Sequence, residues 1–497
     1  MKKFLIRNGL LCDGTGRKME KKDLLIEGEY IKEIRENIPA SEDMEIMDAS
    51  GNIVAPGFID AHAHSDTRKL LYPECKTKLL QGVTTEVDGN CGSSVSCVPG
   101  ECGSYKWKDL KEYGEVLEKV KPAVNTVALC GHNSIRRAVM GEKNTAPCRE
   151  ELEKMKELLK NALENGAAGF SSGLTYFPGK FASTDELIFL AEALKGTQKP
   201  YVSHIRSEGD DLLNAVDEAV KIAKAGSNRF QFSHIKTIFQ RNFHKIDALL
   251  QKVASYQKEG VKITADRYPY VRSATVLHQI LPPPYDKMSD IKEHLASSES
   301  FCKELEEALK QSPRDIPSTI LVKTGKTFGE LAEKENTTPE HLAMLALKED
   351  NMQSAVYLCM SEKNLKKILL KEYVCAGSDG ISAQLDDPAT FNHPRAAGTF
   401  PTFFRMVKKL CGTEEAIRKM TCLPAEIFHI PQRGLLKKGY IADIVIFDEN
   451  SYDSQADFQG KNQTPAGVKK VLVAGKIAFD DSHPEEIYRY GKFIAVK

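Results

Sequence analysis

A regular alternation of short apolar runs with longer amphipathic runs, between residues 57 and 425, most constrains the fold of this 497-residue chain. Helical periodicity is clearest over residues 149–165, 210–226 and 244–260, and Ser183 with Glu186 predicts a capping box. Runs typical of buried strands recur near residues 57–62, 83–91, 124–132, 166–173, 200–205, 230–235, 261–268 and 373–379. Eight strands with helices between them predict an α/β fold, a closed (β/α)8 barrel of the TIM type.

The two ends of the chain and one internal stretch depart from this alternation. Residues 1–56 and 426–497 contain short apolar clusters broken by turn residues, and neither part could bury a sheet face alone. We therefore predict that they combine into one small discontinuous β-sandwich domain beside a barrel domain of residues 57–425. Residues from 281 to about 345 break the rhythm with Pro282-Pro283-Pro284 and charged helical segments. They predict an insertion after the seventh strand, lying over the barrel mouth.

Two histidines, His62 and His64, stand at the end of the first predicted barrel strand. Residues two apart in a strand point to the same side, so both imidazoles project together. Two core histidines bonded to backbone carbonyls are the alternative. The pair on one face, after Pro56-Gly57 and Asp60, favours a metal site.

Three further strand ends carry metal-ligating residue types. Cys91 follows the second strand, and His204 and His234 end two strands that are one βαβ unit apart. Active sites of (β/α)8 barrels lie at this end of the strands. Cys and His are zinc ligands, and three of them leave a fourth position open, which is the arrangement of a catalytic zinc rather than a structural one. We predict that Cys91 also bridges to a second pocket at His62 and His64.

Asp379, in the run Gly377-Ser378-Asp379-Gly380, ends the last predicted strand. By itself it would be a turn residue or a helix N-cap. Beside five candidate metal ligands at strand ends it becomes a candidate general base that takes a proton from water and passes it to a leaving amine.

Bulk composition excludes several classes of protein. Lys plus Arg equals Asp plus Glu, 69 of each, and the cations are scattered, which argues against a nucleic-acid partner. No apolar run approaches membrane-spanning length, and Arg7 and Asn8 end the apolar start too early for a signal peptide. Twelve scattered cysteines without a secretory signal predict reduced thiols and a cytoplasmic protein.

The order of these motifs, HxH, GNCG, SHIR, SHIK and GSDG, resembles the amidohydrolase superfamily and, within it, the D-aminoacylases (N-acyl-D-amino-acid deacylases). Further similar stretches cover residues 166–178, 182–186, 393–400 and 433–445, so that the resemblance runs from about residue 5 to about residue 478. It implies zinc-dependent hydrolysis of the amide of N-acyl-D-amino acids, which are small-molecule substrates. It also implies a tight metal site at Cys91, His204 and His234 and a weaker one at His62 and His64.

The same resemblance assigns substrate contacts. Lys236 and Tyr268 would face the α-carboxylate of the substrate, although alone they would be a solvated lysine and a packing tyrosine. Tyr176, in the matching stretch 166–178, is a further candidate. Arg395 is either a substrate clamp or the structural partner of a carboxylate. Arg272 and His278 are candidates for contact with the amino-acid side chain, which the sequence does not identify.

Two alternatives remain at this point. The first is a cyclic-amide hydrolase of the hydantoinase or dihydroorotase type, which the GNCG motif and a fourth strand without lysine disfavour. The second is a non-catalytic scaffold with the same fold. Its ligands should have been lost, yet all five metal ligands and Asp379 are present.

Overall fold

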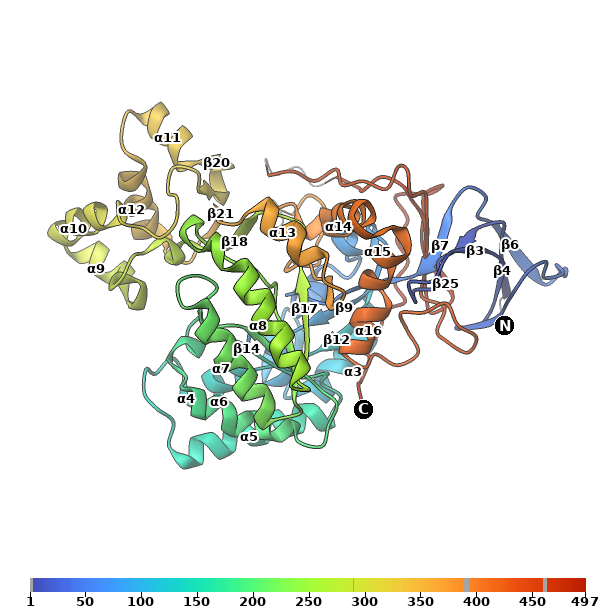
Figure 1. The fold of residues 1–497 in the computed structure, drawn as a ribbon, viewed down its shortest axis with the longest axis horizontal. Helices are drawn as coiled ribbons and strands as arrows, with labels where there is room; N and C mark the ends of the chain where they lie inside the picture. Colours follow the sequence, from blue (N-terminus) through green and yellow to red (C-terminus); the bar gives the residue numbers. More distant parts are fainter. Residues whose placement is uncertain (1–2, 289, 388–392, 459–462) are drawn as a thin grey trace.

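The computed structural model describes residues 3–288, 290–387, 393–458 and 463–497. It has a mixed α/β fold (Figure 1). Helices α9 (Ile291–Ser297), α10 (Glu299–Leu309), α11 (Phe328–Glu335) and α12 (Pro339–Asp350) project at one end of the molecule. The strands nearest the two termini lie at the opposite end. The central region between them carries the candidate site.

All eight predicted strands of the central region are confirmed as parallel strands. Three form one sheet in the order β12-β9-β8, namely β12 (Asn125–Ala128), β9 (Val83–Asp88) and β8 (Phe58–Asp60). Six form a second, in the order β13 (Cys130–Gly131), β14 (Phe170–Gly173), β15 (Tyr201–His204), β16 (Arg229–Phe232), β17 (Lys262–Arg267) and β22 (Val374–Ala376). Only Leu129 separates β12 from β13, so these two segments are one predicted strand. The Ala61 amide donates to the Ala376 carbonyl, which joins the strand ends of β8 and β22.

Helices follow the strands as the periodicity predicts. They are α1 (Arg68–Leu71), α2 (Lys76–Leu79), α3 (Leu110–Val120), α4 (His132–Met140), α5 (Arg149–Glu164), α6 (Thr184–Ala191), α7 (Leu212–Ala225), α8 (Ile246–Lys258), α13 (Glu362–Leu369), α14 (Arg395–Cys411), α15 (Thr413–Met420) and α16 (Cys422–Ile427). Ser183 caps α6 by accepting the Glu186 amide. The Glu186 carboxylate does not complete the predicted capping box: it accepts from Arg136 and contacts His132 Nε2 at 2.8 Å instead.

The two chain ends pair with each other. One sheet has the order β5 (Tyr30–Arg35), β4 (Asp23–Glu27), β1 (Lys3–Arg7) and β6 (Met44–Asp48). The other has the order β25 (Lys476–Asp480), β24 (Val468–Val473), β23 (Ile444–Phe447), β7 (Ile53–Pro56), β2 (Leu10–Leu11) and β3 (Glu20–Lys21). Phe4 and Ile26 of the first sheet share a buried apolar cluster with Val54 and Ile444 of the second. Each end therefore covers apolar surface that the other could not cover alone.

The segment after β17 forms a further unit with its own apolar core. Its antiparallel sheet has the order β18 (Arg272–Val276), β21 (Ser354–Leu358), β19 (Ile320–Leu321) and β20 (Lys326–Thr327). Its helices are α9 (Ile291–Ser297), α10 (Glu299–Leu309), α11 (Phe328–Glu335) and α12 (Pro339–Asp350). Because β18 and β21 lie on either side of residues 281–345, this unit extends beyond the stretch that the sequence predicts. A hairpin of β10 (Gly100–Cys102) and β11 (Tyr105–Trp107) completes the strands.

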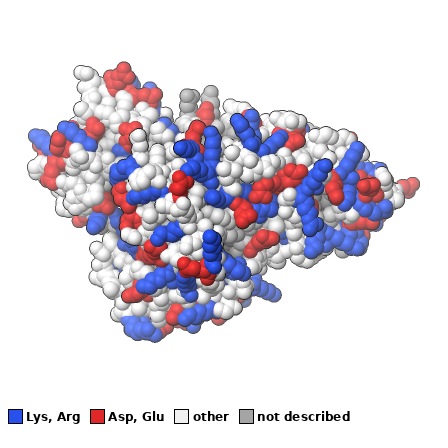
Figure 2. All heavy atoms as spheres, viewed as in Figure 1, with Lys and Arg blue, Asp and Glu red and all other residues white. Residues whose placement is uncertain are grey.

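The surface shows Lys and Arg interspersed with Asp and Glu over the face seen in Figure 2. Within the described ranges, no helix is both long enough and apolar enough to cross a lipid bilayer. All twelve cysteines are free thiols.

Candidate metal centre and active site

The candidate ligands come from the carboxyl ends of four parallel strands. His204 is the last residue of β15, His62 and His64 follow β8, and Cys91 and His234 follow β9 and β16 within three residues. Cys91 and His234 have positive φ angles of 52° and 38°, and Asp379 has 53°. Residues other than glycine seldom adopt this left-handed backbone, and such residues concentrate at functional sites. The sharp turn after each strand aims these side chains at one another.

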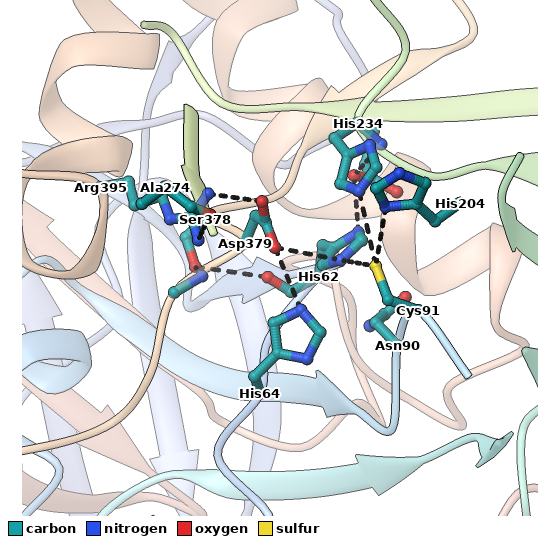
Figure 3. A network of polar contacts seen from close by, with 12 residues as sticks. His62, His64, Asn90, Cys91, His204, His234, Ala274, Ser378, Asp379 and Arg395 are labelled. Carbon is teal, nitrogen blue, oxygen red and sulfur yellow. Dashed lines mark hydrogen bonds and ion pairs between the residues drawn. The ribbon is translucent and has the colours of Figure 1, made fainter. Parts of the chain in front are cut away.

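The Cys91 sulfur lies close to three histidines, His62, His204 and His234 (Figure 3). Sγ is 3.4 Å from His62 Nε2, 3.7 Å from His204 Nδ1 and 3.5 Å from His234 Nε2. In a tetrahedral zinc site with Zn–S of about 2.3 Å and Zn–N of about 2.0 Å, sulfur and nitrogen are about 3.5 Å apart. Both the donor types and their spacing therefore fit a zinc ion.

The electrostatics favour the ligand form of Cys91. Burial by itself raises the pKa of a thiol, but the charges of His62 and His234 hold the pKa of Cys91 well below its usual range. A thiolate, not a thiol, binds metal. The cluster therefore presents the charge state that a cation requires.

The structure groups the ligands differently from the predicted pair of sites. Ligand atoms of His62, Cys91, His234 and Asp379 lie within 4.8 Å of one another, as do those of His204, Glu208 and His234. His64 belongs to neither group, and its Nε2 lies 3.0 Å from Asp379 Oδ1. Both groups have the composition and spacing to bind a metal ion. The division of the ligands into a Cys91–His204–His234 site and a His62–His64 site stays a prediction.

The Asp379 carboxylate forms an ion pair with Arg395. Arg395 Nη1 donates to Asp379 Oδ2 at 2.6 Å, and its Nη2 donates to the Ala274 carbonyl. Burial opposes ionisation, but Arg395 and His64 hold the pKa of Asp379 well below its usual range. Burial by itself lowers the pKa of His64. The hydrogen bond of His64 to Asp379 and its interaction with Cys91 outweigh that effect and raise the pKa of His64 to about 9. Arg395 is thus bonded to a carboxylate and its charge favours the ionised form of Asp379 at neutral pH, while a role of Arg395 as a substrate clamp stays a prediction.

Two buried carboxylates orient the histidines, and sequence reasoning missed both. Asp266 Oδ1 lies 3.0 Å from His62 Nδ1 and accepts the His234 amide at 2.8 Å. Glu208 Oε1 lies 3.0 Å from His234 Nδ1. Such partners fix the ring nitrogen that faces a metal. Asp266 stands at the end of the seventh predicted strand and Glu208 four residues after His204, which are the signals that could have found them.

Lys236 and Tyr268, two of the predicted substrate residues, line a cavity of about 550 Å³ next to the cluster, together with His204, His234 and Asp379. Arg395 lines a second cavity instead. Tyr268 is fully buried, and its hydroxyl has no hydrogen-bond partner among the described residues. The Lys236 ammonium is also buried and contacts Glu208 and His234 Nδ1. It is therefore not the solvated lysine that the residue type alone suggests.

Of three other substrate-contact candidates, Tyr176 and His278 line this cavity and Arg272 does not. Tyr176 packs edge-on against His204, with ring centroids 5.0 Å apart, and lines the cavity. His278 lines it as well. Arg272 donates to the Ser318 carbonyl and lies over the ring of Phe458, and it is not among the residues that line this cavity.

Comparison with known proteins places this geometry in a family. The amidohydrolase family model matches residues 45–310 and 370–479, and the chain belongs to that family. It is 32% identical to the N-acyl-D-glutamate deacylase of Alcaligenes xylosoxydans xylosoxydans, over 99% of this chain and 96% of that protein. It is 31% identical to the D-aminoacylase of the same organism, over 95% and 93% of the two chains.

A solved structure is similar over the whole length. The N-acyl-D-glutamate deacylase from Bordetella bronchiseptica, crystallised with zinc and a phosphonate inhibitor that mimics the tetrahedral intermediate, aligns with a TM-score of 0.84 and 30% identity, covering 99% of both chains. The mixed α/β fold of this chain is thus that of the N-acyl-D-amino-acid deacylases.

Proposed function

We propose that this chain is a zinc-dependent deacylase that hydrolyses the amide bond of N-acyl-D-amino acids to a carboxylate and a free D-amino acid. One observation carries the proposal: the Cys91 sulfur lies 3.4–3.7 Å from a nitrogen of each of three histidines, close to an ionised Asp379. Similarity to deacylases over nearly the whole chain supports it. The free state of all twelve cysteines agrees with a cytoplasmic location.

The architecture that we infer is a closed (β/α)8 barrel. The bond from Ala61 to Ala376 and the parallel bridge between Ala63 and Gly380 support closure between β8 and β22. We assign residues 57–425 to this barrel and residues 1–56 with 426–497 to a β-sandwich domain. The unit after β17 is the insertion, and its residues 278–287 help to line the cavity beside the metal ligands.

For the metal, we assign Cys91, His204 and His234 as one site and His62 with His64 as a weaker second one. A zinc ion held there supplies Lewis acidity toward the amide carbonyl and toward water. The fourth strand, β14, has no lysine, so Cys91 is the residue able to serve both sites. Asp266 and Glu208 hold the rings of His62 and His234 in the orientation that directs one nitrogen toward Cys91.

Asp379 is the catalytic residue that we assign to proton transfer. Its Oδ2 is held by Arg395, and its Oδ1 faces the histidines, 3.5 Å from His62 Nε2. An ionised carboxylate in this position accepts the proton of the attacking water and returns it to the nitrogen of the leaving amine. Such acid–base assistance contributes roughly 10²–10⁴-fold to rate.

The substrate would lie across Asp379, with its two halves in different cavities. Lys236 and Tyr268 would hold the α-carboxylate in the first cavity, because an ammonium and an unpaired buried hydroxyl are donors suited to it. A second cavity of about 570 Å³ also reaches Asp379 and Tyr176. Its apolar side chains, which include Phe177, Val276 and Ile381, suit the acyl group.

A panel of N-acetyl-D- and N-acetyl-L-amino acids, with dihydrouracil as the cyclic amide, tests the proposed function. We expect amine release from D-configured linear substrates and none from dihydrouracil. Hydrolysis of dihydrouracil without hydrolysis of linear amides would establish the cyclic-amide alternative. A zinc-loaded protein inactive on the whole panel would contradict the proposal.

A further inference from the structure

Two cations that line the charged cavity, Arg314 and Lys287, form no ion pair among the described residues, and of these Arg314 is the one held by aromatic rings. The cavity lined by Lys236 and Tyr268 also contains Arg314, from the loop between α10 and β19. Most of the other cations that line it are paired. Lys180 bonds Asp286, Arg206 bonds Glu218, Arg241 bonds Asp210 and Lys236 bonds Glu208.

Arg314 is held in place without being neutralised. Its Nε donates to the Gln279 carbonyl at 2.8 Å, while Nη1 is buried and has no hydrogen-bond partner among the described residues. The guanidinium carbon lies 4.2 Å from the ring centre of Tyr357 and 5.6 Å from that of Phe239. A buried donor that is left unpaired costs free energy unless a ligand satisfies it.

The loop that carries Arg314 is anchored to the rim of the same cavity. The Arg314 amide donates to Ser312 Oγ, and that hydroxyl donates to the Ile280 carbonyl at 2.6 Å. A guanidinium fixed by one hydrogen bond and two aromatic rings is pre-organised to bind a planar anion such as a carboxylate in a bidentate manner.

We propose that Arg314 binds a carboxylate on the substrate side chain, so that this chain prefers N-acyl derivatives of acidic D-amino acids. The inference rests on the proposed deacylase function, in which Lys236 and Tyr268 take the α-carboxylate. Similarity to relatives does not decide this point, because the N-acyl-D-glutamate deacylase and the D-aminoacylase match almost equally well. An acidic side chain would supply the anion that Arg314 lacks.

The test compares N-acetyl-D-glutamate with N-acetyl-D-glutamine, its uncharged isostere, on wild-type protein and Arg314→Met. Methionine retains contact with Tyr357 and Phe239 but has no charge. Loss of a charge-assisted hydrogen bond should lower kcat/KM for N-acetyl-D-glutamate by about 10- to 100-fold. The value for N-acetyl-D-glutamine should change by less than about threefold. Arg241→Met, which removes a paired arginine from the same cavity, is the matched control and should leave the ratio of the two substrates unchanged.

Binding gives an independent measurement. Calorimetry on an Asp379→Asn background should show weaker binding of N-acetyl-D-glutamate after Arg314→Met, with unchanged binding of N-acetyl-D-glutamine. An equal loss on both substrates would overturn the proposal and assign Arg314 to the α-carboxylate or to structure. Wild-type preference for N-acetyl-D-glutamine or N-acetyl-D-methionine would also overturn it, while leaving the deacylase function intact. Inactivity on every N-acyl-D-amino acid would refute the proposed function itself.

Discussion

Asp266 offers a sharp test of how the ligand histidines are held. It is completely buried and accepts three contacts: His62 Nδ1 and the His234 amide at Oδ1, and Gln231 Nε2 at Oδ2. In Asp266→Asn, the retained Oδ1 can keep the first two contacts, but the charge is lost. The new NH2 group would face Gln231 Nε2, which is also a donor, so the Gln231 amide must turn. That turn moves its Oε1 away from the Thr264 hydroxyl that donates to it.

Asp266→Asn should mainly weaken zinc binding, whereas Asp266→Ala should also lower the free energy of unfolding. Partners that orient metal-binding histidines typically contribute about 10- to 100-fold to metal affinity, so Asp266→Asn should weaken zinc binding by that factor. Asp266→Ala leaves three buried donors unpaired, at about 1–3 kcal/mol each, and should lower the free energy of unfolding by about 3 kcal/mol or more.

Chelator competition measures the first effect and urea unfolding of the metal-free protein measures the second. Asp217→Asn is the control, because Asp217 also accepts from neighbouring side chains, Lys252 and Tyr256, but lies on α7 away from the cluster. It should leave zinc affinity unchanged. Wild-type zinc affinity in Asp266→Asn, or wild-type stability in Asp266→Ala, would refute the reasoning.

Four further predictions concern the reacting groups. Cys91→Ala should lose the tight metal and nearly all activity, and stoichiometric zinc in the purified variant would contradict its assignment. Asp379→Asn should keep its zinc while kcat falls by about 10²–10⁴-fold, because an amide does not accept the proton; near wild-type turnover would place the base elsewhere. Arg395→Met removes the main charge that lowers the pKa of Asp379, so the acidic limb of the pH–rate profile should move to higher pH, and an unmoved limb would contradict the ion pair's role. Lys236→Ala should raise KM for N-acyl-D-amino acids more than it disturbs zinc binding, and an equal loss on an amide that lacks the carboxylate would show that Lys236 is structural.

Sequence reasoning succeeded where local periodicity determines position. His62, His204 and His234 stand at or just after strand ends, and parallel strands bring those ends to one edge, so their convergence follows from the chain order alone. Cys91 could be added because it ends another strand of the same set. These contacts depend on where each strand ends, which the apolar pattern predicts, and on the parallel arrangement that follows from the alternation of strands and helices.

The remaining features depend on contacts between distant segments. Asp266 and Glu208 act through histidines that come from other strands or other turns, and no local pattern distinguishes them from other acidic residues. Arg395 is bonded to Asp379, which lies 16 positions earlier in the chain, and no local pattern in the sequence indicates that contact. Glu186 was predicted to cap its own helix, but its contacts with His132 and Arg136 on α4 prevail over the local motif.

A zinc titration of metal-free protein tests the central claim most directly. Protein stripped by a chelator and dialysed should not release amine from N-acetyl-D-glutamate, and activity should return in proportion to zinc up to about one equivalent per chain. The L enantiomer should remain unhydrolysed throughout. Full activity in the stripped protein, or no activity toward any N-acyl-D-amino acid after zinc is restored, would contradict the account.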